Sequence, residues 1–323
     1  RKRSVNPSKG FATLNFRTEH LMRLGVAATP DVAIPTLDWL LHSDHEVALI
    51  ITQPDKPAGR GRVLKQSVVA DWADQHGISI IKPESPSDLR GSLESLDCVI
   101  TIGYGVLLPQ EILDLPKHGF LNLHFSLLPA YRGAAPVQRA LHNGDRVTGV
   151  SVFQLEKGMD TGPIYSQRSV SIQPQWRSVE LLQALSLEGP LAVHDALTMI
   201  TAGQLPSAQE GEPSMAPKIS KQDAQLNFSE DAQTLINKVR AFTYEPGAWC
   251  NWKQEPFKIT SAIAFEDHGL KPGVIAIDGQ RVIVGCGDNT AIELLAVIPA
   301  GKKEMNAADW ARGARLSGGE NFG

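Results

Sequence analysis

The chain has 323 residues, of which 42% are hydrophobic and 20% charged, and this is typical of a globular protein with two domains. No apolar run reaches the roughly 18 residues of a membrane-spanning helix, and the net charge of −4 means that any nucleic-acid-binding surface must be a local basic patch. The three cysteines are far apart and form no CxxC pair, so the sequence indicates buried thiols in a reducing cytoplasm rather than a zinc site or disulfides.

The first segment, residues 1–21, is basic, nearly free of acidic residues and without clear periodicity. Met22 then precedes the first apolar run. We therefore expect Met22 to be the natural start and residues 1–21 to be an added or upstream tail. A basic transit peptide is the alternative, although the segment lacks an initiating Met and a continuous amphipathic stripe.

Short apolar runs alternate with helical patterns through residues 22–202. This alternation predicts a Rossmann-like, mostly parallel sheet with helices on both faces. Ligands of such sheets bind in the loops beyond the carboxyl ends of the strands. The expected strands are 24–28, 47–52, 78–81, 98–102, 120–123, 150–154 and 164–170, and the main helices are 30–41, 67–76 and 179–201.

Residues 203–219 are rich in Gly, Pro, Ser and Glu, and we interpret them as a linker. Beyond them, residues 220–323 begin with one helix, at about 231–242, and continue with short strands separated by Gly and Pro. This spacing predicts a small β-barrel as the second domain. Its expected strands are 248–252, 257–264, 273–277, 281–285 and 292–298.

The densest chemical signal is the segment 120–136, F-L-N-L-H-F-S-L-L-P-A-Y-R-G-A-A-P. Asn122 and His124 are two residues apart at a predicted strand end, so their side chains share one face. Asp160, in a Gly-containing loop after the next strand, can reach the same sheet edge. These groups suit acyl transfer to an amine: the amide can donate to an oxyanion, the imidazole can move a proton or stabilise charge, and the carboxylate can orient the imidazole and favour its charged form. A lone N-x-H pair more often caps a strand turn.

The full string N-L-H-F-S-L-L-P-A-Y-R-G resembles the signature N-x-H-x-S-L-L-P-x-x-R-G of the folate-dependent formyltransferase family, and the spacing to M-D-T-G also matches. The resemblance implies that Asn122, His124 and Asp160 are the catalytic trio. It implies that the formyl donor is 10-formyltetrahydrofolate and that no metal is needed. It also implies that two loops wall the folate pocket, with Ser126, Leu127, Leu128 and Pro129 in one and Gly103, Tyr104, Gly105, Val106 and Leu108 in the other.

Within this family, the chain is most similar to the members that formylate the amine of methionyl initiator tRNA for translation initiation, over roughly residues 22–323. The stretches 52–62, 132–138, 240–249 and 299–306 carry this similarity. It implies an OB-like second domain, 220–323, that binds tRNA beside a catalytic domain, 22–202. We expect a cytoplasmic monomer without membrane attachment. One departure is Ala28, which stands where the family commonly has Gly.

The loop Gln53–Lys65 has four basic residues against Asp55 alone. Its Pro and Gly content, its length and its place at the ligand edge favour phosphate contact over a merely solvated loop. The resemblance implies that this loop enters the acceptor stem of the tRNA, with Arg60 as the central contact. The basic residues are Lys56, Arg60, Arg62 and Lys65.

The second domain has 12 Lys and Arg against 13 Asp and Glu from Lys218 to Gly323, so its tRNA contact must be a patch, which we place at Lys302 and Lys303. Two weaker signals have simpler interpretations. His42-x-x-His45 has metal-like spacing but lies in a polar turn without a third ligand nearby. Trp249 and Trp252 could stack on bases, although packing in the barrel is the more common role.

Two other functions fit parts of the sequence. A formyltransferase acting on an amino sugar of a nucleotide can also have an OB-like second domain, whereas the purine-pathway enzyme would end near the linker. The P-A-G-R-G sequence of the Gln53–Lys65 loop argues against both. A tRNA-binding module without catalysis is opposed by the intact trio.

Overall fold

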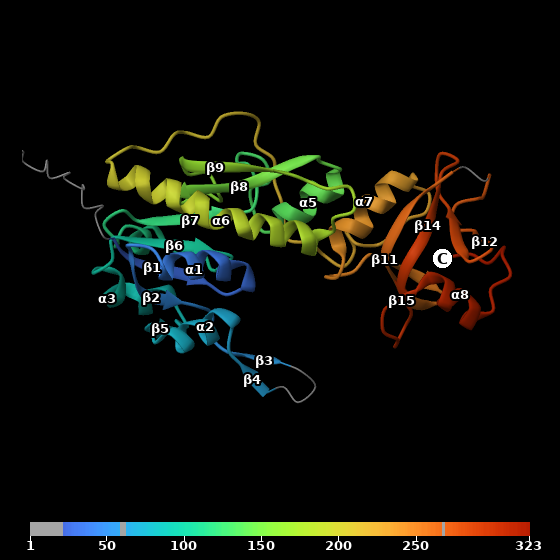
Figure 1. The fold of residues 1–323 in the computed structure, drawn as a ribbon, viewed down its shortest axis with the longest axis horizontal. Coiled ribbons are helices and arrows are strands. Elements are labelled where there is room, and N and C mark those ends of the chain that lie inside the picture. The colour runs from blue at the N-terminus through green and yellow to red at the C-terminus, as the bar shows by residue number, and fades with distance from the viewer. Residues whose placement is uncertain (1–21, 59–62, 267–268) are drawn as a thin grey trace, which may run out of the picture.

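The computed structural model describes residues 22–58, 63–266 and 269–323, and the expected tail 1–21 lies outside these ranges. The first domain is built on a seven-stranded sheet with the order β5-β2-β1-β6-β7-β8-β9 (Figure 1). The predicted Rossmann-like, mostly parallel sheet is confirmed, because only β8 runs in the direction opposite to the other six strands. The strands are β1 (Arg23–Ala28), β2 (Glu46–Ile51), β5 (Ile80–Ile81), β6 (Cys98–Ile102), β7 (Phe120–His124), β8 (Val147–Gln154) and β9 (Ile164–Ser171).

Helices cover both faces of this sheet, as the sequence predicts, because successive strand residues point to opposite sides. In β1, Val26 packs in the hydrophobic cluster that contains Leu185, whereas Ala27 packs in the cluster that contains Leu93. The first face is covered by α1 (Ile34–Leu41), α2 (Val68–His76), α5 (Pro136–Asn143) and α6 (Ser178–Thr201), and the second by α3 (Arg90–Leu93) and α4 (Gln110–Leu113).

A two-stranded hairpin, β3 (Lys56–Ala58) and β4 (Val63–Lys65), occupies the predicted basic loop. It projects away from the large sheet toward one side of the molecule (Figure 1). The predicted contacts Arg60 and Arg62 lie outside the described residues.

The second domain is an antiparallel half-barrel, in agreement with the predicted small barrel. Its core joins α7 to the sheet and to α8, where Trp310 packs against Trp252 and Phe322. Trp249 packs outside the barrel, against the cluster that joins the first domain's core to Ala224 and Phe242, so only Trp252 packs in the barrel as expected. The elements are α7 (Ala232–Phe242), β10 (Trp249–Trp252), β11 (Glu255–Phe265), β12 (Ile275–Asp278), β13 (Arg281–Gly285), β14 (Ala291–Ile298), β15 (Met305–Asn306) and α8 (Ala307–Ala314).

The segment between α6 and α7 runs back across the first domain, visible as the long yellow loop above β8 and β9 in Figure 1. Isolated bridges pair Ser207 with Ile164 and Met215 with Arg132. The predicted linker is therefore attached to the first domain along part of its length. We call residues 207–216 the strap.

The two domains meet where α7 packs on α5. Arg240, on α7, donates from Nε to the backbone oxygen of Trp176 at 2.8 Å and from Nη2 to that of Gln173 at 3.2 Å. Ser178 Oγ donates to the backbone oxygen of Thr243 at 2.5 Å. Hydrogen bonds therefore join α7 to the loop before α6, and the first residue of α6 to the residue that follows α7.

All three cysteines are free and buried. Burial raises the pKa of the Cys98 and Cys286 thiols to about 12, and it also raises the pKa of Cys250. Among the helices that the structure describes, none has the length and apolar character to cross a bilayer.

Candidate active site

Asn122 is positioned by its neighbour in the sheet. The parallel register of β6 and β7 places Thr101 opposite Asn122, and the single hydroxyl proton of Thr101 is shared between Asn122 Oδ1 and the backbone oxygen of Leu121, each 3.0 Å from Oγ1. Because the amide oxygen is engaged, the amide nitrogen is the end available to a ligand. The side chain is therefore oriented as a hydrogen-bond donor.

His124, the last residue of β7, is only 6% exposed. Its Nε2 lies 2.9 Å from the backbone oxygen of Tyr131. Since a carbonyl oxygen can only accept, Nε2 carries the proton and Nδ1 is the proton acceptor of the neutral ring.

The pKa of His124 is lowered from its ordinary value by burial, although the Asp160 carboxylate and the hydrogen bond with the Tyr131 carbonyl act in the opposite direction. We expected the carboxylate to favour a charged imidazole. Its effect is present, but desolvation outweighs it, because burial penalises the charged form. The resting ring is therefore neutral near pH 7.

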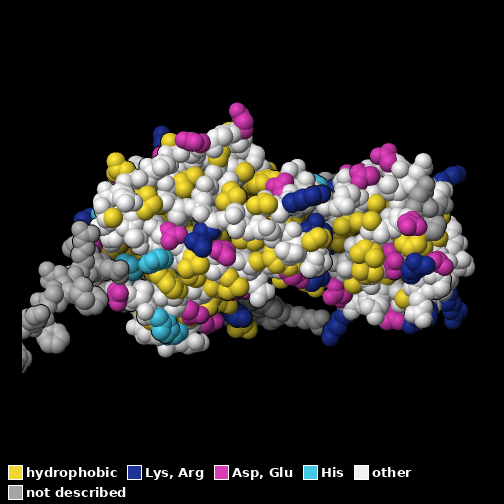
Figure 2. All heavy atoms as spheres, turned by 45° about the horizontal axis from the view of Figure 1, so that its top comes forward, with side chains coloured by type: hydrophobic (Ala, Val, Ile, Leu, Met, Phe, Trp, Pro, Cys, Tyr) yellow, Lys and Arg dark blue, Asp and Glu magenta, His cyan; other side chains and the backbone are white. Residues whose placement is uncertain are grey.

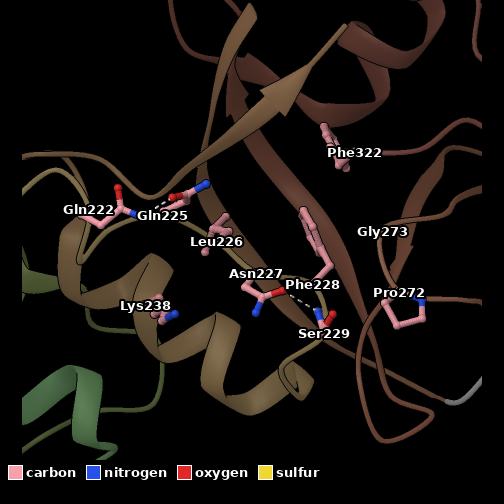
Figure 3. A pocket seen from close by; sticks show the side chains of 11 residues that line it. Gln222, Gln225, Leu226, Asn227, Phe228, Ser229, Lys238, Pro272, Gly273 and Phe322 are labelled. Atoms are coloured by element: carbon pink, nitrogen blue, oxygen red, sulfur yellow. Dashed lines mark hydrogen bonds between the residues drawn. The ribbon is translucent and has the colours of Figure 1, made fainter. Parts of the chain in front are cut away.

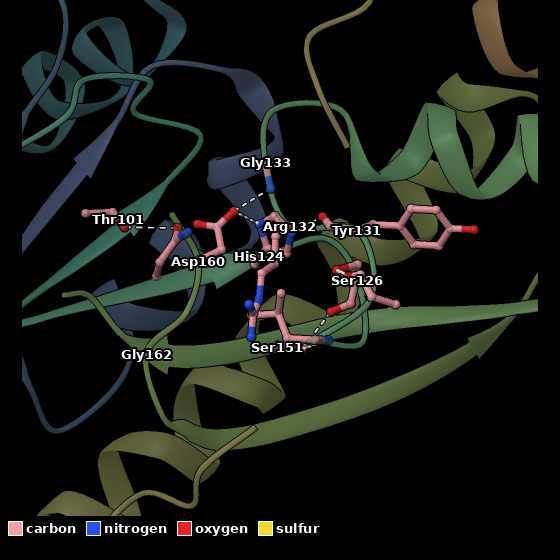
Figure 4. Close-up of polar contacts among 12 residues, drawn as sticks. Thr101, His124, Ser126, Tyr131, Arg132, Gly133, Ser151, Asp160 and Gly162 are labelled. Atoms are coloured by element: carbon pink, nitrogen blue, oxygen red, sulfur yellow. Dashed lines mark hydrogen bonds and ion pairs between the residues drawn. The ribbon is translucent and has the colours of Figure 1, made fainter. Parts of the chain in front are cut away.

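Asp160 faces the imidazole, with Oδ2 at 3.7 Å from His124 Nδ1, and the same oxygen accepts from the backbone N–H of Gly133 at 2.7 Å. The 3.7 Å separation is beyond hydrogen-bond reach, so the carboxylate acts on the ring through its charge. Figure 4 shows Asp160 beside His124, and both line the same cavity as Asn122, so the trio predicted from the sequence is brought together at the end of β7.

The loop that presents Asp160 has an unusual backbone. Asp160 has a φ of 51°, in the left-handed region that most side chains avoid. At Gly162, an added Cβ would lie 1.8 Å from the backbone oxygen of Gln154, so only glycine fits. The glycine in M-D-T-G therefore allows the chain to turn back to β9 at this point.

The trio borders a cavity of about 600 Å³. The loop Gly103–Leu108 lines one wall, as predicted, and includes Leu107, which is 84% exposed. The loop Leu155–Asp160 lines another. The cavity is large enough for a small-molecule ligand of folate size, and its walls combine apolar side chains with the polar groups of the trio.

Ser126, Leu127, Leu128 and Pro129 are not among the residues that line this cavity, and their contact with the folate stays a prediction. They form a turn behind it. Ser126 Oγ donates to the backbone oxygen of Ala130 at 2.6 Å, and Ser151 Oγ donates to the backbone oxygen of Ser126 at 2.6 Å. This turn carries the chain from His124 to the Tyr131 carbonyl that fixes the imidazole.

Two groups of site residues were missed from the sequence. Thr101 lies on a different strand from Asn122, so only the sheet register reveals their contact. The loop segment Leu155–Met159 also lines the cavity. Gly158 within this segment and Gly162 after it had indicated a tight loop that carries Asp160, but not that the segment lines the cavity.

Of the predicted tRNA contacts that the structure describes, Lys56, Lys65, Lys302 and Lys303, none lines the cavity beside the trio. Lys56 and Lys65 face each other across the hairpin. Lys56 Nζ donates to Gln53 Oε1 at 2.5 Å, and Gln53 Nε2 donates to the backbone oxygen of Tyr104 at 2.7 Å, so the base of the hairpin contacts the cavity wall.

Lys302 and Lys303 are exposed in the turn between β14 and β15. The structure does not bring them near the cavity. On the face shown in Figure 2, Lys and Arg side chains are dispersed among acidic ones. The basic residues therefore form no broad positive field on that face, and a nucleic-acid contact there would rest on a few residues.

A second cavity, of about 560 Å³, lies in the C-terminal part of the chain (Figure 3). Its only basic lining residue, Lys238, pairs with Glu230 at 2.6 Å. It is remote from the trio, which belongs to the first domain. Within residues 22–58, 63–266 and 269–323, no three His, Cys, Asp or Glu side chains gather as metal ligands would.

The chain was compared with known protein families. Residues 24–197 match the formyl transferase family, and residues 218–315 match the formyl transferase C-terminal domain. A methionyl-tRNA formyltransferase of Streptomyces coelicolor is 45% identical over 312 residues, covering 94% of this chain and 100% of the relative. One of Corynebacterium glutamicum (strain R) is 42% identical and covers 91% and 98%.

Solved structures share the fold at low identity. HypX from Aquifex aeolicus, in complex with tetrahydrofolic acid, has a TM-score of 0.64 at 18% identity, covering 90% of this chain and 47% of that one. The methionyl-tRNA formyltransferase from Clostridium thermocellum has a TM-score of 0.55 at 15% identity, covering 85% and 99%.

Proposed function

The chain belongs to the methionyl-tRNA formyltransferase family, and from this premise we propose how its own residues perform the reaction. The enzyme transfers a formyl group to the amine of methionyl-tRNA. We assign 10-formyltetrahydrofolate as donor and the initiator tRNA as acceptor. The observation that carries the assignment is the trio of Asn122, His124 and Asp160 at the edge of the 600 Å³ cavity.

Asn122 stabilises the developing negative charge. When the methionyl amine attacks the formyl carbon, the formyl oxygen becomes an oxyanion. The amide nitrogen of Asn122 can donate to it, since Thr101 holds the amide oxygen at 3.0 Å. A donor that is already oriented needs no rearrangement as the charge appears.

His124 moves the proton. The attacking amine loses a proton as the new carbon–nitrogen bond forms, and the neutral Nδ1 can accept it. The resulting imidazolium is stabilised by Asp160, whose Oδ2 is 3.7 Å away. The proton then passes to the folate nitrogen as the old carbon–nitrogen bond breaks, which restores the neutral ring and releases tetrahydrofolate.

Recognition of the tRNA is assigned to two parts of the chain. We divide the chain into a catalytic domain, 22–202, a linker, 203–219, and a tRNA-binding domain, 220–323. The hairpin loop Gln53–Lys65 would contact the acceptor end, because its base touches the cavity wall through Gln53. Lys302 and Lys303 would contact the tRNA from the second domain.

The test is the formylation of methionyl-tRNA by alanine variants. We expect Asn122→Ala, His124→Ala and Asp160→Ala each to lower kcat by about 10²-fold or more, the scale for losing one oxyanion donor or acid–base group. His42→Ala is the matched control, since His42 is exposed in the turn between α1 and β2, does not line the cavity and should leave kcat unchanged. Near-normal kcat for His124→Ala would contradict the assignment.

A further inference from the structure

One side chain of the strap, Gln209, bonds to both loops that form the active site. Its Nε2 donates to the backbone oxygens of Asp160 and Gly162, each at 2.8 Å. Its Oε1 accepts from Arg132 Nε at 3.1 Å and from Arg132 Nη2 at 2.6 Å. A carboxamide offers two donors and two acceptor lone pairs, so all four are used.

These hydrogen bonds hold the two loops that set the position of the Asp160 carboxylate relative to His124. Asp160 reaches His124 only because its loop adopts the left-handed φ of 51°, which is unfavourable for a non-glycine residue. Its carboxylate also accepts from Gly133, the residue after Arg132. Gln209 therefore links the backbone of the Asp160 loop to Arg132, next to the hydrogen bond between Gly133 and the Asp160 carboxylate.

We infer that Gln209 is a positioning residue, which holds the Asp160 loop so that the carboxylate stays opposite His124 Nδ1. The inference rests on the proposed function of the trio. It assigns the strap a role in the reaction, beyond joining two domains. Gln209 itself is not among the residues that line the cavity.

The strap should survive removal of the carboxamide because its other anchors are independent. Ser214 accepts backbone bonds from Arg132 at 2.8 Å through its carbonyl and from Tyr131 at 2.9 Å through its hydroxyl. The backbone of Ser207 pairs with that of Ile164. A Gln209→Met variant, which keeps the length of the side chain without its polar atoms, should therefore fold with a Tm within about 2 °C of the parent.

The experiment is a double-mutant cycle on formyl transfer to methionyl-tRNA. Gln209→Met should lower kcat by about 10-fold, less than the 10² of a 1 Å misplacement, with both KM values changed by less than about 2-fold. Asp160→Asn is the second background, since Asn also tolerates the left-handed conformation. If Gln209 acts through the Asp160 carboxylate, adding Gln209→Met to the Asp160→Asn variant should lower kcat by less than about 2-fold.

One further variant distinguishes the bonds to Arg132 from those to the two carbonyls, and another serves as a control. Gln209→Glu keeps both acceptors for Arg132 but cannot donate to the two carbonyls, so it should lose kcat as Gln209→Met does. Gln204→Met makes the same change at an exposed glutamine outside the strap and should leave kcat unchanged. An equal loss in both backgrounds, an unchanged kcat for Gln209→Met, or full activity of Gln209→Glu would overturn the inference. Failure of the parent enzyme to formylate methionyl-tRNA would instead refute the proposed function.

Discussion

At the scale of single residues, Thr101 decides which end of Asn122 faces the cavity. We predict that Thr101→Val, which keeps the shape but removes the hydroxyl, lowers kcat by about 3- to 10-fold, equivalent to the ~0.5–1.5 kcal/mol of one hydrogen bond. Steady-state formylation kinetics measure this. Thr101→Ser restores the hydroxyl and should retain most of the activity, whereas full kcat in Thr101→Val would show that Asn122 needs no such support.

The ionisation of His124 predicts the acid limb of the pH profile. Only the neutral ring can accept the proton, and burial lowers its pKa below the ordinary 6.5. The α-amine of the substrate titrates separately, with a pKa of about 7.7–8.0 for an ordinary α-amine. Two groups, the amine and then His124, should therefore each gain a proton as the pH falls. We therefore expect a second loss of kcat below pH 6.5.

Asp160→Asn provides the control for this profile. The carboxylate raises the pKa of His124, so its removal should move the lower limb to still lower pH and leave the amine's limb in place. The measurement is the single-turnover rate as a function of pH. A lower limb that stays fixed in Asp160→Asn would mean that another group titrates there.

The shared face of Asn122 and His124 was predictable at this scale because the strand period places residues two apart on one side of a sheet, whereas their grouping with Asp160 as a trio was implied by the family resemblance. Thr101 was not, since its contact spans 21 positions and depends on strand register. The position of Ser126–Pro129 outside the cavity lining was unpredictable for the same reason. Whether a turn lines a cavity or supports it depends on distant partners, here Ser151 on β8.

At the scale of elements, the hairpin provides the separate test of tRNA recognition. Arg60→Ala should lower kcat/KM for initiator methionyl-tRNA by the equivalent of about 1–3 kcal/mol if Arg60 contacts a base edge. If it contacts only phosphate, all tRNAs should be affected alike and the salt slope should decrease by about one unit. Folate binding, measured by calorimetry, should not change. Unchanged kinetics with both initiator and elongator tRNA would exclude the loop from recognition.

The sheet and the main helices followed from the sequence, and the differences occur in short elements. The strands β3 and β4 have three residues each, too few for a period to be recognised, so this hairpin was expected only as a loop. The helix α8 was missed although Asn306 stands at its N-cap. The composition of residues 203–219 indicates a linker but contains no information on which backbone groups they meet.

At the scale of the whole molecule, the joint between the domains rests partly on Arg240. We predict that Arg240→Met, which keeps the aliphatic stem, lowers the free energy of unfolding by about 1–3 kcal/mol, because two backbone carbonyls at the joint lose a charged donor. Urea denaturation measures this. Arg312→Met is the matched control, since Arg312 is exposed and forms its ion pair with Asp309, three residues before it, and should change stability by less than about 0.5 kcal/mol. Equal effects of the two variants would contradict the role of the joint.

The burial of all three cysteines also determines how the molecule can be probed. A thiol whose pKa is raised to about 12 has almost no thiolate at neutral pH, so Cys98 and Cys286 should not react with maleimides, and neither should Cys250. A pair of introduced cysteines, at the exposed Val63 of the hairpin and at Lys302, would then carry the only fluorescent labels. Energy transfer between the two dyes would report directly whether the hairpin and the second domain approach each other as a tRNA binds.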